Sequence, residues 1–274
     1  MTPSAGAALS SEGLGFVYPD GTRALTGIDL LVPAGIRLAI VGQNGSGKST
    51  LVRHFNGLLR ATEGRVLVGG EEVSRRHVAE LAQQVGIAFQ NPDRQIFAGS
   101  VRSEVAFGPR NLGLRGEELE SAVKSALEAV RLGGEGETNP YDLGYSRRKL
   151  LTIASVLAMR TPIVVLDEPT TGQDLRGVRT IEGIVATLAA EGRTVIAVSH
   201  DLRFVAETFE RVVVMRQGTI VLDGTPSEVF AEANWATLRS TNLEPPYAAR
   251  LGARLGLGST PTEESLVSAL SAGT

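Results

Sequence analysis

The sequence predicts an α/β fold built around a mostly parallel β-sheet. Short apolar runs rich in β-branched residues alternate with longer stretches of helical periodicity, which is the order of strand–helix–strand units. The runs are apolar throughout, as expected for strands that are covered on both faces. The expected strands are 38–41, 85–89, 163–166, 194–198 and 211–215.

The segments between these strands carry signals for helices and turns. The glycine pair at 69–70 separates two short extended runs and predicts a hairpin. Near the end of the chain, residues 243–246 (Leu-Glu-Pro-Pro) interrupt any regular element. Residues 260–263 predict a capping box, with Pro261 in the first helical position of a last helix that reaches Leu270. The other expected helices are 47–59, 117–131, 146–159 and 175–190.

Composition argues against several classes of protein. The formal net charge is −3, whereas nucleic-acid-binding proteins usually carry a basic excess, so nucleic acid is not an expected partner. The absence of cysteine rules out disulfides and cysteine metal sites. The N-terminus lacks the basic start and apolar run of a secretory signal. Apolar runs such as 163–166 and 212–215 are far shorter than the roughly 18 residues of a transmembrane helix, so a membrane role is expected to require a membrane-spanning partner.

A glycine-rich loop follows the first strand of the expected parallel sheet and fits the pattern G-x-x-x-x-G-K-[ST]. Glycines let the backbone approach phosphate groups at φ values that other residues avoid. Successive N–H groups at the start of the next helix attract the anion. The lysine of this pattern, Lys48, reaches the β- and γ-phosphates, and the hydroxyl of Ser49 binds Mg²⁺. The expected nucleotide-binding residues are Gly42, Gln43, Asn44, Gly45, Ser46, Gly47, Lys48, Ser49 and Thr50.

Two adjacent carboxylates end the apolar strand 163–166. Asp167 is well placed to hold Mg²⁺, directly or through water, and Glu168 can polarise an attacking water as a general base. Two adjacent carboxylates also occur often at the solvent-exposed end of a strand without any catalytic role. Their occurrence together with a phosphate-binding loop favours the catalytic interpretation.

The run LDEPTTGQD at 166–174 resembles the Walker B motif and D-loop of ABC (ATP-binding cassette) ATPases. Each further match has a bland structural explanation when taken alone, but all of them occur in the order of that family. Tyr18 resembles the aromatic residue that stacks on adenine, Gln90 the Q-loop glutamine that touches Mg²⁺ and the attacking water, Asp174 the D-loop aspartate that acts across a dimer, and His200 the switch histidine near the γ-phosphate.

This resemblance spans about residues 10 to 230 and implies the fold in more detail. It implies an ABC-type P-loop NTPase with a RecA-like core, an antiparallel β subdomain and a helical subdomain. We expect the ABC ATPase domain at 1–232, with the helical subdomain at about 92–160. A helical C-terminal extension at 233–274 is expected to contribute to dimer contact.

The segment from Phe89 to Leu114 is similar to the Q-loop region of the energy-coupling factor (ECF) ATPases, and the tail also looks like theirs. These proteins drive the uptake of vitamins and transition-metal ions. In that family the Q-loop segment contacts a transmembrane T-component, and a separate membrane protein captures the substrate. Gln95, Ile96 and Phe97 are therefore candidate docking residues. The alternative is that Ile96 and Phe97 pack inside the helical subdomain.

One motif departs from the family pattern. The signature Leu-Ser-Gly-Gly-Gln, which caps the ATP bound to the partner subunit, is replaced by the segment Leu143, Gly144, Tyr145, Ser146 and Arg147. Tyr145 adds bulk where backbone should approach phosphate, although Ser146 can serve as a helix N-cap. The basic run 147–149 is expected to keep the helix start attractive to anions. With its other motifs intact, the chain is expected to form a heterodimer with a second ABC ATPase that has a regular signature.

The resemblance implies hydrolysis of ATP to ADP and phosphate, with Glu168, His200, Gln90 and Lys48 as catalytic residues and Ser49, Gln90 and Asp167 around Mg²⁺. The expected location is peripheral, at the cytoplasmic face of the cell membrane. The alternatives are the ATPase of another ABC transporter subtype, a soluble ABC ATPase and a regulatory nucleotide-binding module. The sequence does not name the cargo.

Overall fold

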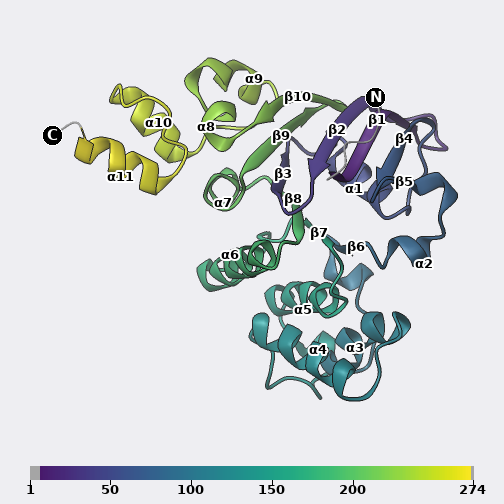
Figure 1. Cartoon of the computed structure of the whole chain (residues 1–274). Helices are drawn as coiled ribbons and strands as arrows, with labels where there is room; N and C mark the ends of the chain where they lie inside the picture. The colour runs from purple at the N-terminus through teal and green to yellow at the C-terminus, as the bar shows by residue number, and fades with distance from the viewer. Residues whose placement is uncertain (1–6, 273–274) are drawn as a thin grey trace.

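The larger sheet of the protein has the strand order β10-β9-β3-β8-β7-β6 in this computed structural model, which describes residues 7–272 (Figure 1). From β9 to β6 all neighbouring strands are parallel, and β10 pairs antiparallel with β9 at one edge. The mostly parallel sheet and its five expected strands are confirmed. The strands are β3 (Arg37–Val41), β6 (Val85–Ala88), β7 (Ile163–Asp167), β8 (Thr194–Val198), β9 (Arg211–Arg216) and β10 (Thr219–Gly224).

Alternate residues along these strands belong to two different apolar clusters. Leu38 and Ile40 of β3 pack toward α1 (Lys48–Phe55) and the smaller sheet, whereas Ala39 and Val41 pack toward helices on the other face. Both faces are therefore buried. This explains why the strands appear in the sequence as continuous apolar runs.

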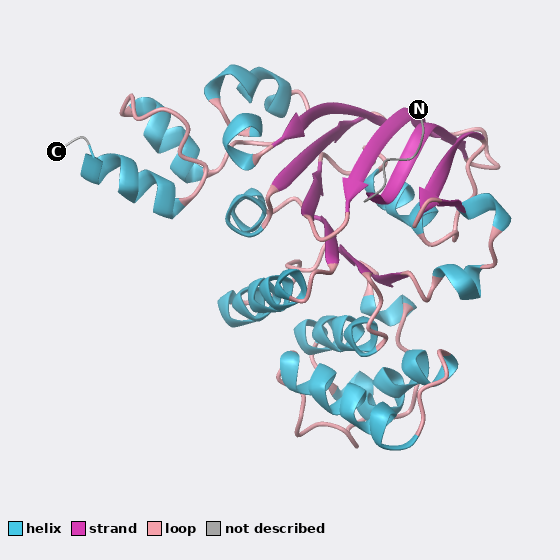
Figure 2. Ribbon diagram, viewed as in Figure 1, coloured by secondary structure: helices cyan, strands magenta, loops and turns pink. Residues whose placement is uncertain are grey.

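A second, antiparallel sheet lies against α1 and has the order β2-β1-β4-β5 (Figure 2). It consists of β1 (Ala7–Val17), β2 (Arg23–Pro33), β4 (Glu63–Val68) and β5 (Glu71–Glu72). Gly69 and Gly70 have φ values of +60° and +83°, which suits the two-residue turn between β4 and β5 and confirms the predicted hairpin.

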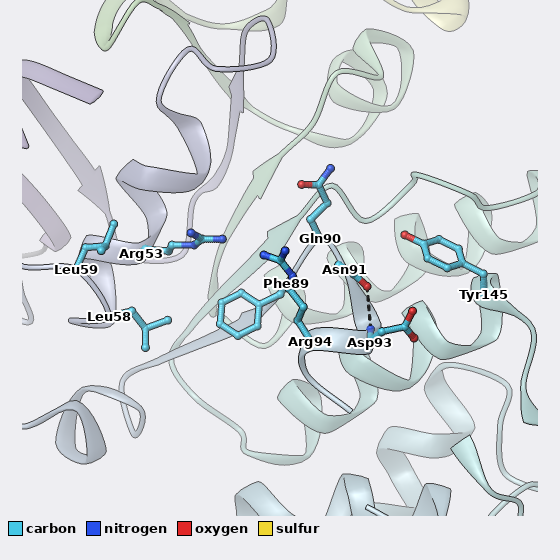
Figure 3. A pocket seen from close by; sticks show the side chains of 9 residues that line it. All are labelled: Arg53, Leu58, Leu59, Phe89, Gln90, Asn91, Asp93, Arg94 and Tyr145. Carbon is cyan, nitrogen blue, oxygen red and sulfur yellow. Dashed lines mark hydrogen bonds between the residues drawn. The ribbon is translucent and has the colours of Figure 1, made fainter. Parts of the chain in front are cut away.

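The helix α1 starts at Lys48, directly after the glycine-rich loop, and ends earlier than expected. It stops at Phe55 rather than at residue 59, because Gly57 adopts a φ of +73° just past the helix end. A glycine in this conformation is a common helix terminator. Leu58 and Leu59 therefore lie outside the helix, beside the loop that follows β6 (Figure 3).

Three helices pack together as a separate layer in the lower part of Figure 1. They are α3 (Val101–Asn111), α4 (Gly116–Ala129) and α5 (Tyr145–Ala158). α4 and α5 were expected from their periodicity, but α3 was not, because glycine and proline residues surround it and Pro109 lies inside it. On the same side of the sheet, α6 (Leu175–Ala190) follows β7, and α7 (Leu202–Thr208) follows β8.

Short helices make up the rest of the chain. After β10 come α8 (Pro226–Val229), α9 (Trp235–Arg239), α10 (Tyr247–Arg254) and α11 (Glu263–Ala272), while α2 (Val78–Leu81) lies before β6. Single 3₁₀ turns occur at Val73–Arg75, Pro92–Arg94, Pro140–Asp142 and Glu232–Asn234. Over residues 7–272, no helix combines the length and the apolar character needed to cross a membrane.

The predicted cap of the last helix is wrong by two residues. Thr262, rather than Thr260, accepts a hydrogen bond from the Ser265 N–H at 3.1 Å, and the Thr262 N–H donates to the Ser265 hydroxyl at 3.0 Å. The hydroxyl of Thr260 is instead buried and donates to the Ala248 carbonyl at 2.9 Å. Thr260 thus ties the last two helices together, and Pro261 lies before α11.

Candidate active site

In the glycine-rich loop between β3 and α1, two positions have a conformation that favours glycine and lie close to neighbouring main-chain atoms. Gly42 has a φ of +152°, and a Cβ there would lie 2.3 Å from the Met215 carbonyl oxygen. Gly47 has a φ of +101°, and a Cβ there would lie 2.8 Å from the Ala24 carbonyl oxygen. Among the residues that the structure describes, no side chain caps the N-terminus of α1, and its first turn has no acidic residue. The N–H groups at this helix start are thus open to an anion.

Lys48 lies inside the curve of this loop. Its Nζ donates to the carbonyl oxygens of Gly42 at 2.7 Å and Gln43 at 2.8 Å, and only 6% of the residue is exposed. Burial lowers the pKa of Lys48, while Glu168 and Asp167 partly oppose this effect. A desolvated cation surrounded by unused N–H donors is the arrangement that a phosphate group requires.

Ser49 and Asp167 come from distant parts of the chain and meet at the same edge of the sheet. The Ser49 hydroxyl donates to Asp167 Oδ1 at 3.2 Å. Asp167 is 2% exposed, and burial raises its pKa, although the hydrogen bond from Ser49 acts in the opposite direction. A hydroxyl and a carboxylate are hard oxygen ligands of the kind that Mg²⁺ prefers, so the two residues fit this ion.

Glu168 follows Asp167 at the end of β7 with an unusual backbone. Its φ is +52°, and its N–H donates to the Val198 carbonyl at 2.8 Å. A non-glycine residue in this region is strained, and such strain is often found at functional sites. Glu168 Oε2 accepts a hydrogen bond from His200 Nδ1 at 2.7 Å, and the His200 side chain is 61% exposed. The predicted base and the predicted switch histidine are thus adjacent.

Tyr18 lies beside the start of α1, as its predicted role at the nucleotide requires. Its hydroxyl and that of Thr50 are 3.0 Å apart, and its ring meets the edge of Phe16 at a centroid distance of 4.8 Å. The side chain is half-buried. The ring is therefore held in place next to the phosphate-binding loop.

The segment after β6 (89–95) is organised by main-chain contacts. Gln95 uses its side-chain oxygen to accept from the Phe89 N–H at 2.9 Å. Gln90 is exposed, and among the described residues its side chain has no hydrogen-bond partner; Figure 3 shows it directed away from Phe89 and Arg94. The carbonyl oxygen of Gln90 accepts from the ammonium group of Lys149. Burial lowers the pKa of Lys149 to about 8.

The three candidate docking residues have different environments. Ile96 is only 4% exposed and belongs to the apolar core, which agrees with the alternative that it packs inside the protein. Phe97 is 60% exposed and stacks edge-on against Phe107 with a centroid distance of 4.7 Å. Gln95 is engaged with the backbone of Phe89, as described above. Of the three, Phe97 presents the most apolar surface to a partner.

The signature-like segment (143–147) differs from what was expected of it. α5 begins at Tyr145 with Gly144 as its N-cap, so Ser146 is not the cap. Instead the Ser146 hydroxyl donates to Gln173 Oε1 at 2.7 Å, and Gln173 Nε2 donates back to the Ser146 carbonyl at 3.0 Å. Leu143 is buried, whereas Tyr145 is 40% exposed and its ring lies against Gly172.

The basic run at the start of α5 does not leave free charge for an anion. Arg147 pairs with Glu135 at 2.7 Å and Arg148 with Asp93 at 3.1 Å. Lys149 points inward and is 1% exposed. Each cation therefore already has partners within the chain, which argues against the expected attraction of an anion.

Several contacts around the site were not predicted from the sequence. Asp174 caps α6 by accepting a hydrogen bond from the Gly177 N–H at 2.8 Å. This structural role is separate from the role across a dimer that the family resemblance implies. Gln173 joins the D-loop to the signature-like segment. Asn242, from the C-terminal extension, donates to Gln43 Oε1 at 2.7 Å and so touches the phosphate-binding loop. The contact of Asp174 is local, but the partners of Gln173 and Asn242 are far apart in the chain, so only the fold reveals them.

The chain matches the ABC transporter family model over residues 25–171. It is 44% identical over 244 residues to the energy-coupling factor transporter ATP-binding protein EcfA of Methanothermobacter thermautotrophicus, covering 88% of this chain and 78% of that protein. It is 43% identical over 245 residues to the protein of the same name from Methanocaldococcus jannaschii, covering 89% of this chain and 87% of that protein.

Solved structures resemble the fold over most of its length. The structure of cbiO1 from Clostridium perfringens, described as part of the ABC transporter complex cbiONQ, matches with a TM-score of 0.76 at 36% identity, covering 92% of this chain and 99% of that one. A dimeric ATP-binding cassette bound to ADP and phosphate matches with a TM-score of 0.74 at 24% identity, covering 79% of this chain and 98% of that one, which supports the fold alone.

Proposed function

Because this chain belongs to the ABC transporter family and is an ATP hydrolase similar to the ECF ATP-binding proteins, we propose that it couples ATP hydrolysis to uptake of a vitamin or transition-metal ion through a transmembrane T-component. The observation that carries this proposal is the convergence of Lys48, Ser49, Asp167, Glu168 and His200 at one edge of the parallel sheet. Ligands of open α/β sheets bind at this carboxyl edge.

ATP enters with its phosphates in the curve of the glycine-rich loop. Lys48 leaves the carbonyl oxygens of the loop and pairs with the β- and γ-phosphates, while the N–H groups at the start of α1 bind the same oxygens. Tyr18 stacks on the base. Ser49, Asp167 and Gln90 would hold Mg²⁺, which neutralises phosphate charge when bound.

Glu168 then acts on the attacking water. Its carboxylate accepts the proton of the water, which adds to the γ-phosphorus as ADP leaves. His200 now donates to Glu168 at 2.7 Å, and in the loaded site it turns to the γ-phosphate. The exposed position of its ring leaves room for this movement. Products are ADP and phosphate.

The dimer that completes this site contains a second, different ABC ATPase. In an ABC dimer each ATP lies between the phosphate loop of one chain and the signature of the other. Tyr145 places an aromatic ring where the signature has glycine, and Ser146 is bonded to Gln173 rather than free for a phosphate. A partner with a regular signature would cap the ATP on this chain. We expect the C-terminal extension to add to the dimer contact.

The membrane partner docks beside the Q-loop. A groove of about 710 Å³ lies between the end of α1 and the segment after β6; Figure 3 shows its lining, which includes Arg53, Leu58, Phe89, Arg94 and Tyr145. The exposed pair Phe97 and Phe107 offers a second apolar contact. The chain is thereby held at the cytoplasmic face of the membrane. A separate membrane protein captures the substrate.

Co-purification tests this proposal. The chain is tagged in its native cell, the membranes are solubilised gently, and stoichiometric partners are identified. The proposal predicts a second ATPase with the sequence Leu-Ser-Gly-Gly-Gln, a multi-span membrane protein and a small substrate-binding membrane protein. The variant Phe97→Ser should lose the membrane protein while keeping the second ATPase, and Leu31→Ser on β2 serves as an exposed apolar control. Recovery of this chain alone from the soluble fraction would overturn the proposal.

A further inference from the structure

Lys149 is a buried cation with no role in the mechanism above. It lies in the second turn of α5, four residues after Tyr145, and is 1% exposed. Among the described residues no carboxylate pairs with it directly. Burial disfavours its charged form, and the nearby charges of Asp167 and Glu168 favour that form without bonding to the ammonium, so polar groups have to surround it. Its hydrogen bonds therefore indicate what it is for.

The Lys149 ammonium group has three donors, and they meet three main-chain carbonyl oxygens. The acceptors are Phe89 at 3.3 Å, Gln90, and Asp167 at 3.0 Å. Phe89 and Gln90 directly follow β6, and Asp167 ends β7. All three hydrogens of the ammonium are thus used, and all of them reach the ends of two neighbouring parallel strands.

The strands themselves do not hold these two ends together. The pairing of β6 with β7 stops at Ala88, the last residue of β6, opposite Leu166, which is one residue before the end of β7. Beyond that point Asp167 continues to pair with Val198 of β8, but nothing in the β6–β7 ladder fixes Gln90 relative to Asp167. Beyond the last pair of β6 and β7, the hydrogen bonds of Lys149 to the Gln90 and Asp167 carbonyl oxygens connect the two segments in place of strand pairing.

We propose that Lys149 is a positioning residue for the Mg²⁺–ATP site, and this inference rests on the proposed function. By binding the carbonyl oxygens of Gln90 and Asp167, it fixes the backbones from which both metal-binding side chains project. Groups that orient the ligands of a metal commonly change metal affinity by roughly 10- to 100-fold when removed. Loss of Lys149 is expected to act in the same range while leaving the phosphate-binding loop untouched.

The test is a calorimetric titration of ATP into the full chain at a series of Mg²⁺ concentrations. The variant Lys149→Met keeps the length of the side chain but has no donor. Without Mg²⁺, its Kd for ATP should equal that of the wild type within about twofold. The Mg²⁺ concentration at which Mg²⁺ has half of its full effect on ATP affinity should rise roughly 10-fold. Lys149→Gln, which keeps two N–H donors, should recover part of this loss.

A matched control separates positioning from general stability. Thr152→Val removes another buried hydrogen bond of α5, from Thr152 to the Lys149 carbonyl at 2.8 Å, and should not shift the Mg²⁺ dependence. An unchanged Mg²⁺ half-point in Lys149→Met, or an equal shift in Thr152→Val, overturns the inference. If Lys149→Met does not fold, the same titration of Lys149→Gln decides. If the ATP affinity of the wild-type chain does not depend on the Mg²⁺ concentration, this result would instead contradict the proposed function.

Discussion

The phosphate-binding half of the site and the signature-like segment are built in different ways. Lys48, Asp167 and Glu168 are each at most 6% exposed. Lys48 donates to the glycine-rich loop, Asp167 accepts from Ser49, and Glu168 accepts from His200 at the edge of the sheet. The signature-like segment instead presents Tyr145 at 40% exposure and binds the D-loop of its own chain through Ser146 and Gln173. One half is organised to receive a ligand, whereas the other is occupied by contacts within the chain.

This difference matters because an ABC dimer needs both halves, one from each subunit. A chain with an intact phosphate site and an altered signature is suited to hydrolyse its own ATP and poorly suited to cap the ATP of its partner. Two copies of such a chain would form two irregular sites. The contrast between the halves is therefore the observation that supports the proposed heterodimer.

Removing the cation from the intact half should have the largest effect on nucleotide binding. Lys48→Met deletes a charge-assisted contact to phosphate, and hydrogen bonds to charged groups contribute about 1.5–3 kcal/mol. The Kd for ATP, measured by calorimetry, should rise roughly 10- to 100-fold. Lys124→Met, on the exposed face of α4, is the control and should leave the Kd unchanged. An equal Kd in both variants would show that the loop does not bind phosphate through Lys48.

Restoring the altered half should raise activity in the absence of a partner. The quadruple variant Gly144→Ser, Tyr145→Gly, Ser146→Gly and Arg147→Gln rebuilds the regular signature. ATP hydrolysis by the isolated chain at high concentration should increase about 10-fold, because backbone N–H groups and a hydroxyl regain access to the γ-phosphate across a homodimer. The same variant carrying Glu168→Gln should remain inactive. If the variant forms ATP-dependent dimers but its hydrolysis rate does not increase, Tyr145 is not what limits the activity of the isolated chain.

The contact between the two halves should be visible in stability. Gly172→Ala introduces a Cβ at a φ of +75° that would lie 2.8 Å from Tyr145 Cε1. Positive φ and overpacking together are expected to reduce the free energy of unfolding in urea by about 1–3 kcal/mol. In a Tyr145→Ala background the cost should fall to about 1 kcal/mol, from the backbone alone. Equal costs in both backgrounds would mean that the ring does not press on the D-loop.

The sequence predicted the parts of this molecule whose signals are local. Buried strands such as β7 appear as apolar runs, and the phosphate loop is specified by glycines that no other residue could replace. The strands β1 and β2 have no such signal, because their register shifts and their mixed exposure break the alternation of apolar and polar residues. Local signals predicted only the hairpin of β4 and β5, and the rest of the antiparallel sheet was expected from resemblance to a family alone.

Site residues that depend on tertiary contacts were harder to predict. The sequence left open whether Ile96 docks to a partner or packs inside the protein, and its place in the fold makes it a core residue. The side chains of Arg147 and Lys149 follow each other closely in the sequence, yet one pairs with Glu135 at the surface and the other is buried among carbonyl oxygens. Periodicity in the sequence predicts a helix, but it does not predict the tertiary contacts of the polar residues on that helix.

The most direct test of the heterodimer account is the ATPase rate of the native complex carrying Glu168→Gln in this chain alone. If this chain holds the site that a regular partner signature completes, the rate should fall about 100-fold or more, since a general base contributes 10²–10⁴-fold. ATP should still bind. A complex that keeps more than half of its rate would show that hydrolysis occurs at the partner's phosphate loop, and that the altered signature of this chain is competent.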